Sequence, residues 1–190
     1  DAESMMAANH LCNEYGFDTI SACGTIAGIM ECYNAGVFTK EELEGVPLPW
    51  GDGEAAVKML EKICRGEGCG AIFQHGSQYA ADHYKKGHEF LAVASGIEES
   101  AHDSRFAPGL ARTYQYDPTP GRHVKGGYGP GQGNQPAEIK HDPTSKGFGD
   151  ALKVSDRELT NASGLCNMSA MGIFPGMRRE MMHAATGIRY

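Results

Sequence analysis

Residues 52–66, DGEAAVKMLEKICRG, carry the clearest helical pattern of the chain and decide its fold class. Asp52 stands where an N-cap is expected, and Gly66 begins a glycine-rich stretch that stops a helix. The apolar side chains recur every three or four residues, as on one face of a helix: Ala55, Ala56, Met59, Leu60 and Ile63. The pattern predicts an amphipathic helix that buries this face against other helices.

Helical patterns also occur on both sides of this segment, so the predicted class is mainly α. Thr19 is the expected cap of one helix, and Gly36 is placed to end it in a left-handed conformation. Residues 90–94 predict a short strand or an extended link. The helices are expected over residues 2–14, 19–33, 76–85, 147–159 and 176–185, with a short helix from Thr39 and a helical turn near Leu110.

A long segment rich in glycine and proline, residues 108–143, interrupts the helical patterns. Such a stretch inside a compact domain is usually functional or disordered. This one contains more aromatic character than a flexible linker normally has: Tyr114, Tyr116, His123 and Tyr128. We therefore expect an ordered loop over a site.

The composition limits the classes of protein that the chain can belong to. Its 190 residues are 41 % hydrophobic and 22 % charged, as in soluble globular proteins, and the net charge is −7. Basic residues are scattered, which argues against nucleic-acid binding. No apolar run is long enough for a membrane span and no signal peptide is recognisable, so a cytoplasmic protein is expected. Both ends are expected to continue into further chain.

The six cysteines do not form a regular framework, and no CxxC pair occurs. A secreted disulfide scaffold is therefore not expected, and Cys64 with Cys69 are too isolated to predict a zinc site. Most of the cysteines are expected to be small buried residues. Cys23 is assigned to the core, although it could be a metal ligand.

Two short segments far apart in the chain share one pattern. NEYGFD at residues 13–18 and NASGLC at residues 161–166 both read Asn-x-x-Gly-apolar-(Asp or Cys). In each, a glycine follows an expected helix, and a polar side chain three residues earlier could face the edge of a ligand. The pattern alone is also compatible with two ordinary helix ends.

These segments resemble the D-x-x-G-L-(D/C) motif that aldehyde:ferredoxin oxidoreductases carry twice, once for each of two pterins that chelate one tungsten. Further stretches resemble the same family and follow in its order. They are Asp18-Thr19-Ile20-Ser21, Ile26-Ala27, Met30-Glu31-Cys32-Tyr33, Trp50-Gly51-Asp52, Arg65-Gly66-Glu67-Gly68, the segment from Tyr116 to His123, and Ala184-Ala185-Thr186-Gly187. Together they cover nearly the whole chain.

The resemblance implies helical domains 2 and 3 of such an enzyme. Residues 1–93 would be the helical part of the second domain with the first pterin motif. Residues 94–190 would begin the third domain, with the His123 loop and the second motif. One pterin would be bound by Asn13, Gly16 and Asp18, and the other by Asn161, Gly164 and Leu165. Cys166 would be the fourth thiolate of a 4Fe–4S cluster, and His123 a catalytic acid/base or substrate-orienting residue.

The function that the resemblance implies is oxidation of aldehydes to carboxylic acids by a tungsten or molybdenum bis-pyranopterin, with electrons passed through the 4Fe–4S cluster to ferredoxin. The rest of the polypeptide, or a complementary subunit, would complete the sites, and a homodimer is left open. Two alternatives are the tungsten subunit of a class II benzoyl-CoA reductase-like enzyme and a cofactor-free helical interaction module.

Two departures from the family count against a simple transfer of its function, and they favour the cofactor-free module. Asn13 and Asn161 stand where the family usually has aspartate, and an amide holds ring N–H groups less strongly than a carboxylate does. The family's other three cluster cysteines, its N-terminal sheet domain and a catalytic glutamate do not occur in these residues. In the family they precede the first motif.

Overall fold

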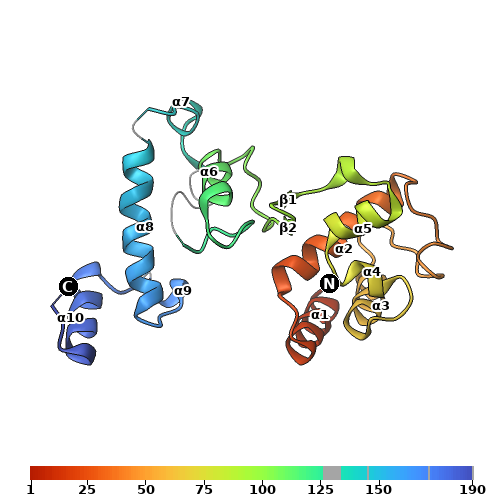
Figure 1. The fold of residues 1–190 in the computed structure, drawn as a ribbon, viewed down its shortest axis with the longest axis horizontal. Coiled ribbons are helices and arrows are strands. Elements are labelled where there is room, and N and C mark those ends of the chain that lie inside the picture. The colour runs from red at the N-terminus through yellow and green to blue at the C-terminus, as the bar shows by residue number, and fades with distance from the viewer. Residues whose placement is uncertain (126–133, 145, 171, 190) are drawn as a thin grey trace. The chain divides into compact units, whose positions relative to one another are not determined.

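The computed structural model describes residues 1–125, 134–144, 146–170 and 172–189 (Figure 1). The chain forms two compact units, Asp1–Ala101 and His102–Tyr190. We call them unit 1 and unit 2. The sequence-based assignment of family domains, divided between residues 93 and 94, stays a prediction. Tyr128, one of the aromatic residues of the predicted loop, lies outside the described residues.

Unit 1 is mainly helical (Figure 1). Its small sheet pairs two antiparallel strands, with Val93 opposite Glu98 and Ala94 opposite Ile97. The elements are α1 (Ala2–Tyr15), α2 (Thr19–Asn34), α3 (Gly53–Arg65), α4 (Gly70–Phe73), α5 (Ser77–Tyr84), the 3-10 helix η1 (His88–Phe90), β1 (Val93–Ala94) and β2 (Ile97–Glu98).

The core of unit 1 forms around the helix predicted from residues 52–66. In α3, Ala55, Met59, Leu60 and Ile63 are buried, and the helix packs against α1 and α4. The same apolar cluster contains Ile26, Ile29 and Met30 of α2, together with Phe38, Leu43, Leu48 and Phe73. The amphipathic pattern thus correctly predicts which face of α3 is buried.

Aspartates cap the first three helices of unit 1. The Asp52 carboxylate accepts from the Ala55 backbone N–H at 2.9 Å, as expected. The predicted cap of α2 was wrong: Asp18, and not Thr19, accepts from the backbone N–H of Ser21, at 2.7 Å.

The predicted short helix after Thr39 was also wrong, because residues 40–45 form a turn. The capping box itself is present. The Thr39 hydroxyl accepts from the Glu42 N–H at 3.3 Å, and the Glu42 carboxylate accepts from the Thr39 N–H at 2.9 Å. Glu44 and Gly45 then adopt positive φ angles of 53° and 82°, which end helical propagation.

Unit 2 is also helical in the described residues. Its elements are α6 (Gly109–Tyr116), α7 (Ala137–Lys140), α8 (Lys146–Ala162), α9 (Asn167–Ala170) and α10 (Pro175–Thr186). The helices expected near Leu110, from residue 147 and from residue 176 are present as α6, α8 and α10. The short helices α7 and α9 were not predicted.

The buried side chains of unit 2 are largely polar. Leu110 and Tyr114 of α6 are buried, but so are Asp117, Arg122, Asp150 and Arg178. The Arg112 guanidinium joins α6 to α8 through the Asp150 carboxylate, with Nε and Oδ2 2.9 Å apart. Among the helices that the structure describes, none has the length and apolar character of a membrane span.

Candidate cofactor-binding turns

The first glycine motif lies where α1 turns into α2. Gly16 adopts a left-handed conformation with φ 74° and ψ 28°, and the N–H of Phe17 donates to the carbonyl of Cys12 at 2.8 Å. Asp18 then caps α2. This is the hydrogen-bond pattern of a Schellman helix end followed at once by a new helix.

The second motif has the same local structure at the end of α8. Gly164 has φ 70°, and the N–H of Leu165 donates to the carbonyl of Thr160 at 3.4 Å, again five residues back. Cys166 immediately precedes α9, and its carbonyl accepts from the Ala170 N–H at 2.9 Å. Cys166 therefore occupies the position that Asp18 occupies in the first turn.

The shared sequence pattern thus corresponds to a shared backbone geometry. Both glycines have positive φ, which disfavours any residue with a Cβ. A Cβ at Gly16 or Gly164 would meet no described atom within 4 Å. The glycines are therefore required by backbone conformation, and no described atom crowds either turn at these positions.

The predicted binding residues line the exposed sides of these turns. Asn13, Gly16 and Asp18 are exposed in unit 1. In unit 2, Gly164 and Cys166 are exposed, whereas Asn161 and Leu165 are half-buried. Each unit thus brings its own three or four predicted residues together.

The side chain of Asn161 is already engaged with protein atoms. Its Nδ2 donates to the Glu158 carboxylate at 3.2 Å and, over a long 3.4 Å, to the carbonyl of Val124. Asn167 also donates to the Val124 carbonyl, at 3.5 Å. An aspartate at 161 could not donate these bonds. The amide at this position therefore ties the predicted loop to the second motif.

This contact places His123, the residue before Val124, next to the second motif. The His123 ring is half-buried and packs edge-on against His102, with centroids 5.0 Å apart, and against Tyr114 at 6.1 Å. The pKa of His123 is lowered from its ordinary value, first by burial and then by His102, Arg157 and Arg122, while Asp117 opposes the shift. His123 therefore favours the neutral imidazole more than an ordinary histidine does.

The cysteines divide into buried and exposed groups. Cys12, Cys32 and Cys69 are buried, as expected, and Cys64 is intermediate. The assignment of Cys23 to the core was wrong, because this side chain is exposed on α2. Within the described parts of the chain, no three histidine, cysteine or acidic side chains gather as a metal site.

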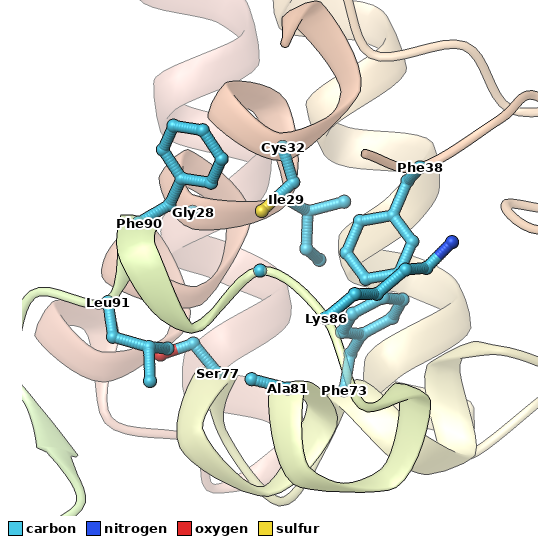
Figure 2. A pocket seen from close by; sticks show the side chains of 11 residues that line it. Gly28, Ile29, Cys32, Phe38, Phe73, Ser77, Ala81, Lys86, Phe90 and Leu91 are labelled. Carbon is cyan, nitrogen blue, oxygen red and sulfur yellow. The ribbon is translucent and has the colours of Figure 1, made fainter. Parts of the chain in front are cut away.

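A small cavity of about 20 Å³ in unit 1 is a poorer candidate site. Figure 2 shows its wall of Ile29, Phe38 and Phe73 with the sulfur of Cys32. Burial, with Glu89 and Glu31 nearby, raises the pKa of the Cys32 thiol to about 11. Lys86 binds the Glu42 carboxylate at 2.6 Å. The space suits about one water molecule and presents no reactive group.

A second cavity, in unit 2, was missed by sequence reasoning. Asp156, Arg157 and Thr160 of α8 line it together with Asn167 and Arg178. Arg178 is buried, but the apolar residues of α10 do not define a clear face. The sequence pattern therefore did not predict that Arg178 is buried. The position of Asn167 directly after the second motif was the one available signal.

Comparison with known proteins agrees with this geometry. The fold and the paired turns define a mainly α protein with two equivalent helix–glycine–helix sites. All of residues 1–190 match the family described as "Aldehyde ferredoxin oxidoreductase, domains 2 & 3". The chain therefore belongs to the aldehyde ferredoxin oxidoreductase family, and its mainly α fold is that of domains 2 and 3, as predicted.

Individual relatives give the same result. The tungsten-containing aldehyde ferredoxin oxidoreductases of Thermococcus kodakarensis and Pyrococcus furiosus are each 33 % identical over 98 % of this chain and 31 % of their own length. The chain thus spans about a third of these relatives. A third protein, an aliphatic sulfonate oxidoreductase WOR-like subunit of Pyrococcus furiosus, is 36 % identical over 43 % of this chain and 13 % of its own length.

Proposed function

We propose that this chain is part of a cytoplasmic tungsten- or molybdenum-pterin enzyme that oxidises aldehydes to carboxylic acids and passes the electrons through a 4Fe–4S cluster to ferredoxin. The observation that carries the proposal is the pair of equivalent turns at Gly16 and Gly164. Their form suits two copies of one flat ligand, and relatives over nearly the whole chain are named as tungsten-containing oxidoreductases.

Each turn offers a polar side chain and an open glycine to one pterin. At the first turn, the exposed Asn13 side chain would face the edge of the ring system beside Gly16. The Asp18 carboxylate accepts the Ser21 N–H as the cap of α2, and because a carboxylate can accept several N–H donors it would accept from the ligand as well. The residues present therefore fit the group.

The second turn would hold its pterin differently. The Nδ2 of Asn161 is bonded to Glu158 and Val124, which leaves the amide oxygen to accept from a ring N–H. Leu165 would contact the ring face, and the backbone beside Gly164 would approach its edge. We infer that Asn161 binds the pterin less strongly than an aspartate would, and that the fixed position of the amide offsets part of this loss.

Cys166 would supply one thiolate to the cluster. Its exposed sulfur precedes α9, at the position equivalent to Asp18 in the first turn. This difference between the turns suits two jobs, because a thiolate would bind iron whereas a carboxylate would accept from a ring N–H. Three further thiolates would come from outside these residues.

His123 would accept a proton during turnover. Oxidation of R–CHO with water to R–COOH releases two protons and two electrons, and the metal–pterin group supplies the two-electron acceptor when bound. The lowered pKa of His123 favours an unprotonated imidazole nitrogen, as a general base requires. Tyr114 and His102 hold the ring in place.

Metal analysis of the purified intact protein tests the proposal. Tungsten or molybdenum with iron, together with aldehyde-dependent reduction of ferredoxin, would support it. Neither metal nor iron would favour the cofactor-free interaction module. Tungsten or molybdenum with iron, together with turnover of a sulfonate or a benzoyl thioester but not of aldehydes, would support the proposed cofactor. The proposed substrate would then be wrong.

A further inference from the structure

The cavity in unit 2 has a volume of about 230 Å³ and lies among α8, α9 and the start of α10. Five of its lining side chains are polar: Asp156, Arg157, Thr160, Asn167 and Arg178. Lined in this way, the cavity is suited to a polar ligand. Neither Gly164 nor Cys166 of the second turn is among its lining residues.

Two of these side chains have a buried polar atom without a hydrogen-bond partner among the described residues. The atoms are Nε of Arg178 and Oδ1 of Asn167. Arg178 is only 6 % exposed, and its terminal nitrogens are taken by Asp156 at 2.7 Å and by the Thr160 hydroxyl. Both residues line the cavity, and a buried donor and a buried acceptor are costly unless a ligand or water pairs with them.

The start of α10 adds positive potential at the same place. Phe174 and Arg178 line the cavity, and α10 begins between them with proline in its first turn and no side-chain cap. The backbone N–H groups of Gly176 and Met177 therefore have no partner within the helix. Such N–H groups favour an anion.

The side-chain charges favour an anion as well. Arg157 and Arg178 bring two positive charges to the cavity, whereas Asp156 brings one negative charge that is used in the ion pair with Arg178. An entering anion would thus meet a net positive site. A donor group on the same ligand would meet Asn167 Oδ1.

We propose that this cavity binds a small oxyacid monoanion that also carries a hydroxyl group. The anionic oxygen accepts from Arg178 Nε and from Arg157, and the hydroxyl donates to Asn167 Oδ1. A short hydroxycarboxylate and inorganic phosphate share this chemistry. Acetate has the charge but lacks the hydroxyl.

The site would communicate with the predicted catalytic loop. Arg157 is one of the cations that lower the pKa of His123, and Asn167 also bonds to the Val124 carbonyl. An anion beside Arg157 would offset that charge. The pKa of His123 would then rise on binding.

Calorimetric titration of the intact protein tests the proposal without reference to turnover. Glycolate, inorganic phosphate and acetate are titrated separately at constant ionic strength. We expect glycolate or phosphate to bind at least several-fold more tightly than acetate, and the tighter of the two identifies the source. If neither binds more tightly than acetate, the proposal is wrong.

A matched pair of variants locates the site. Arg157→Gln should weaken binding about tenfold, as expected for a lost charge-assisted bond. Arg179→Gln makes the same charge change at an exposed position on α10 and should leave binding within about twofold. Equal effects of the two variants would contradict the proposed location. The result is independent of the metal content, so the enzyme proposal can fail while this one stands.

Asn167→Ala tests the role of the amide oxygen. This variant should lose the preference for glycolate or phosphate over acetate, because the acceptor for the hydroxyl is gone. Circular dichroism checks that the variant is folded. A preference retained in full by the folded variant would contradict the assigned hydroxyl contact.

Discussion

Unit 1 and unit 2 bury different kinds of side chain. The main apolar cluster belongs entirely to unit 1, where α2, α3 and the segment from Phe38 to Leu48 contribute to it. In unit 2 the buried set is largely polar, and large apolar side chains such as Phe148, Met168 and Phe174 are exposed. Unit 1 is thus stabilised mainly by apolar burial, and unit 2 depends on hydrogen bonds and ion pairs.

Unit 2 exposes several large apolar side chains, of a kind that other protein often covers. We expect the remainder of the polypeptide or a complementary subunit to cover some of them. The contrast then has a functional meaning: the proposed catalytic and cluster residues, His123 and Cys166, both belong to the unit with the more polar interior.

The largest expected effect comes from the core of unit 1. Met59 is completely buried, so Met59→Ala should lower the free energy of unfolding by about 2–5 kcal/mol. Phe148→Ala removes a larger side chain that is 74 % exposed. It should change the free energy of unfolding of this chain by about 0.5 kcal/mol or less. Urea denaturation measures the free energy of unfolding of both variants. Similar losses of stability would contradict the difference between the interiors of the two units.

An intermediate effect is expected from the polar interior of unit 2. Asp150→Ala leaves the Arg112 guanidinium without its carboxylate and should cost about 1–2 kcal/mol. The loss is smaller than for a fully buried pair because the Arg112 side chain is 36 % exposed. Thermal unfolding monitored in unit 2 measures it. A variant as stable as the unmodified protein would show that this ion pair does not hold α6 to α8.

Smaller and equal effects are expected from the two turns. Gly16→Ala and Gly164→Ala each force a Cβ into a left-handed conformation, with φ of 74° and 70°, and should cost about 1 kcal/mol. Neither Cβ would meet a described atom within 4 Å, so no steric clash adds to the cost in stability. If denaturation showed losses that differ by more than about 1 kcal/mol, the two turns would not be equivalent.

The smallest effect concerns protonation in unit 2. The pKa of His123 should lie below its usual 6.5, so folding is less stable as the pH falls below 6.5, where the unfolded imidazole takes up a proton first. His102→Gln removes one of the causes and should raise the pKa. Nuclear magnetic resonance titration of the His123 ring measures the shift, and an unchanged midpoint would exclude His102 as a cause.

The sequence predicted the local structure where a single signal dominates. The face of α3 follows from apolar spacing, and Gly36, predicted to be left-handed after a helix, has a φ of 73°. The failures concern competition between neighbouring groups. Asp18 displaced Thr19 as the cap, and the positive φ of Glu44 and Gly45 stopped a helix that the Thr39 capping box favoured.

The candidate site was predicted only in part, for a similar reason. The pattern at residues 161–166 located a turn, but not the bonds from Asn161 and Asn167 that tie it to Val124, 37 or more residues away in sequence. The buried Arg178 and its cavity depend on how three helices pack, which no local pattern encodes. The exposed position of Cys23 likewise follows from the packing of α2.

The most direct test of the account compares two exposed cysteines in the cofactor-loaded intact protein. Cys166→Ser should alter the cluster's electron paramagnetic resonance signal or lower the iron content, and slow ferredoxin reduction, because a harder ligand replaces a thiolate. Cys23→Ser, exposed beside the first turn, should leave the signal, the iron content and the rate unchanged. A Cys166→Ser protein with full iron, a native signal and normal ferredoxin reduction would contradict the assignment of Cys166 to the cluster.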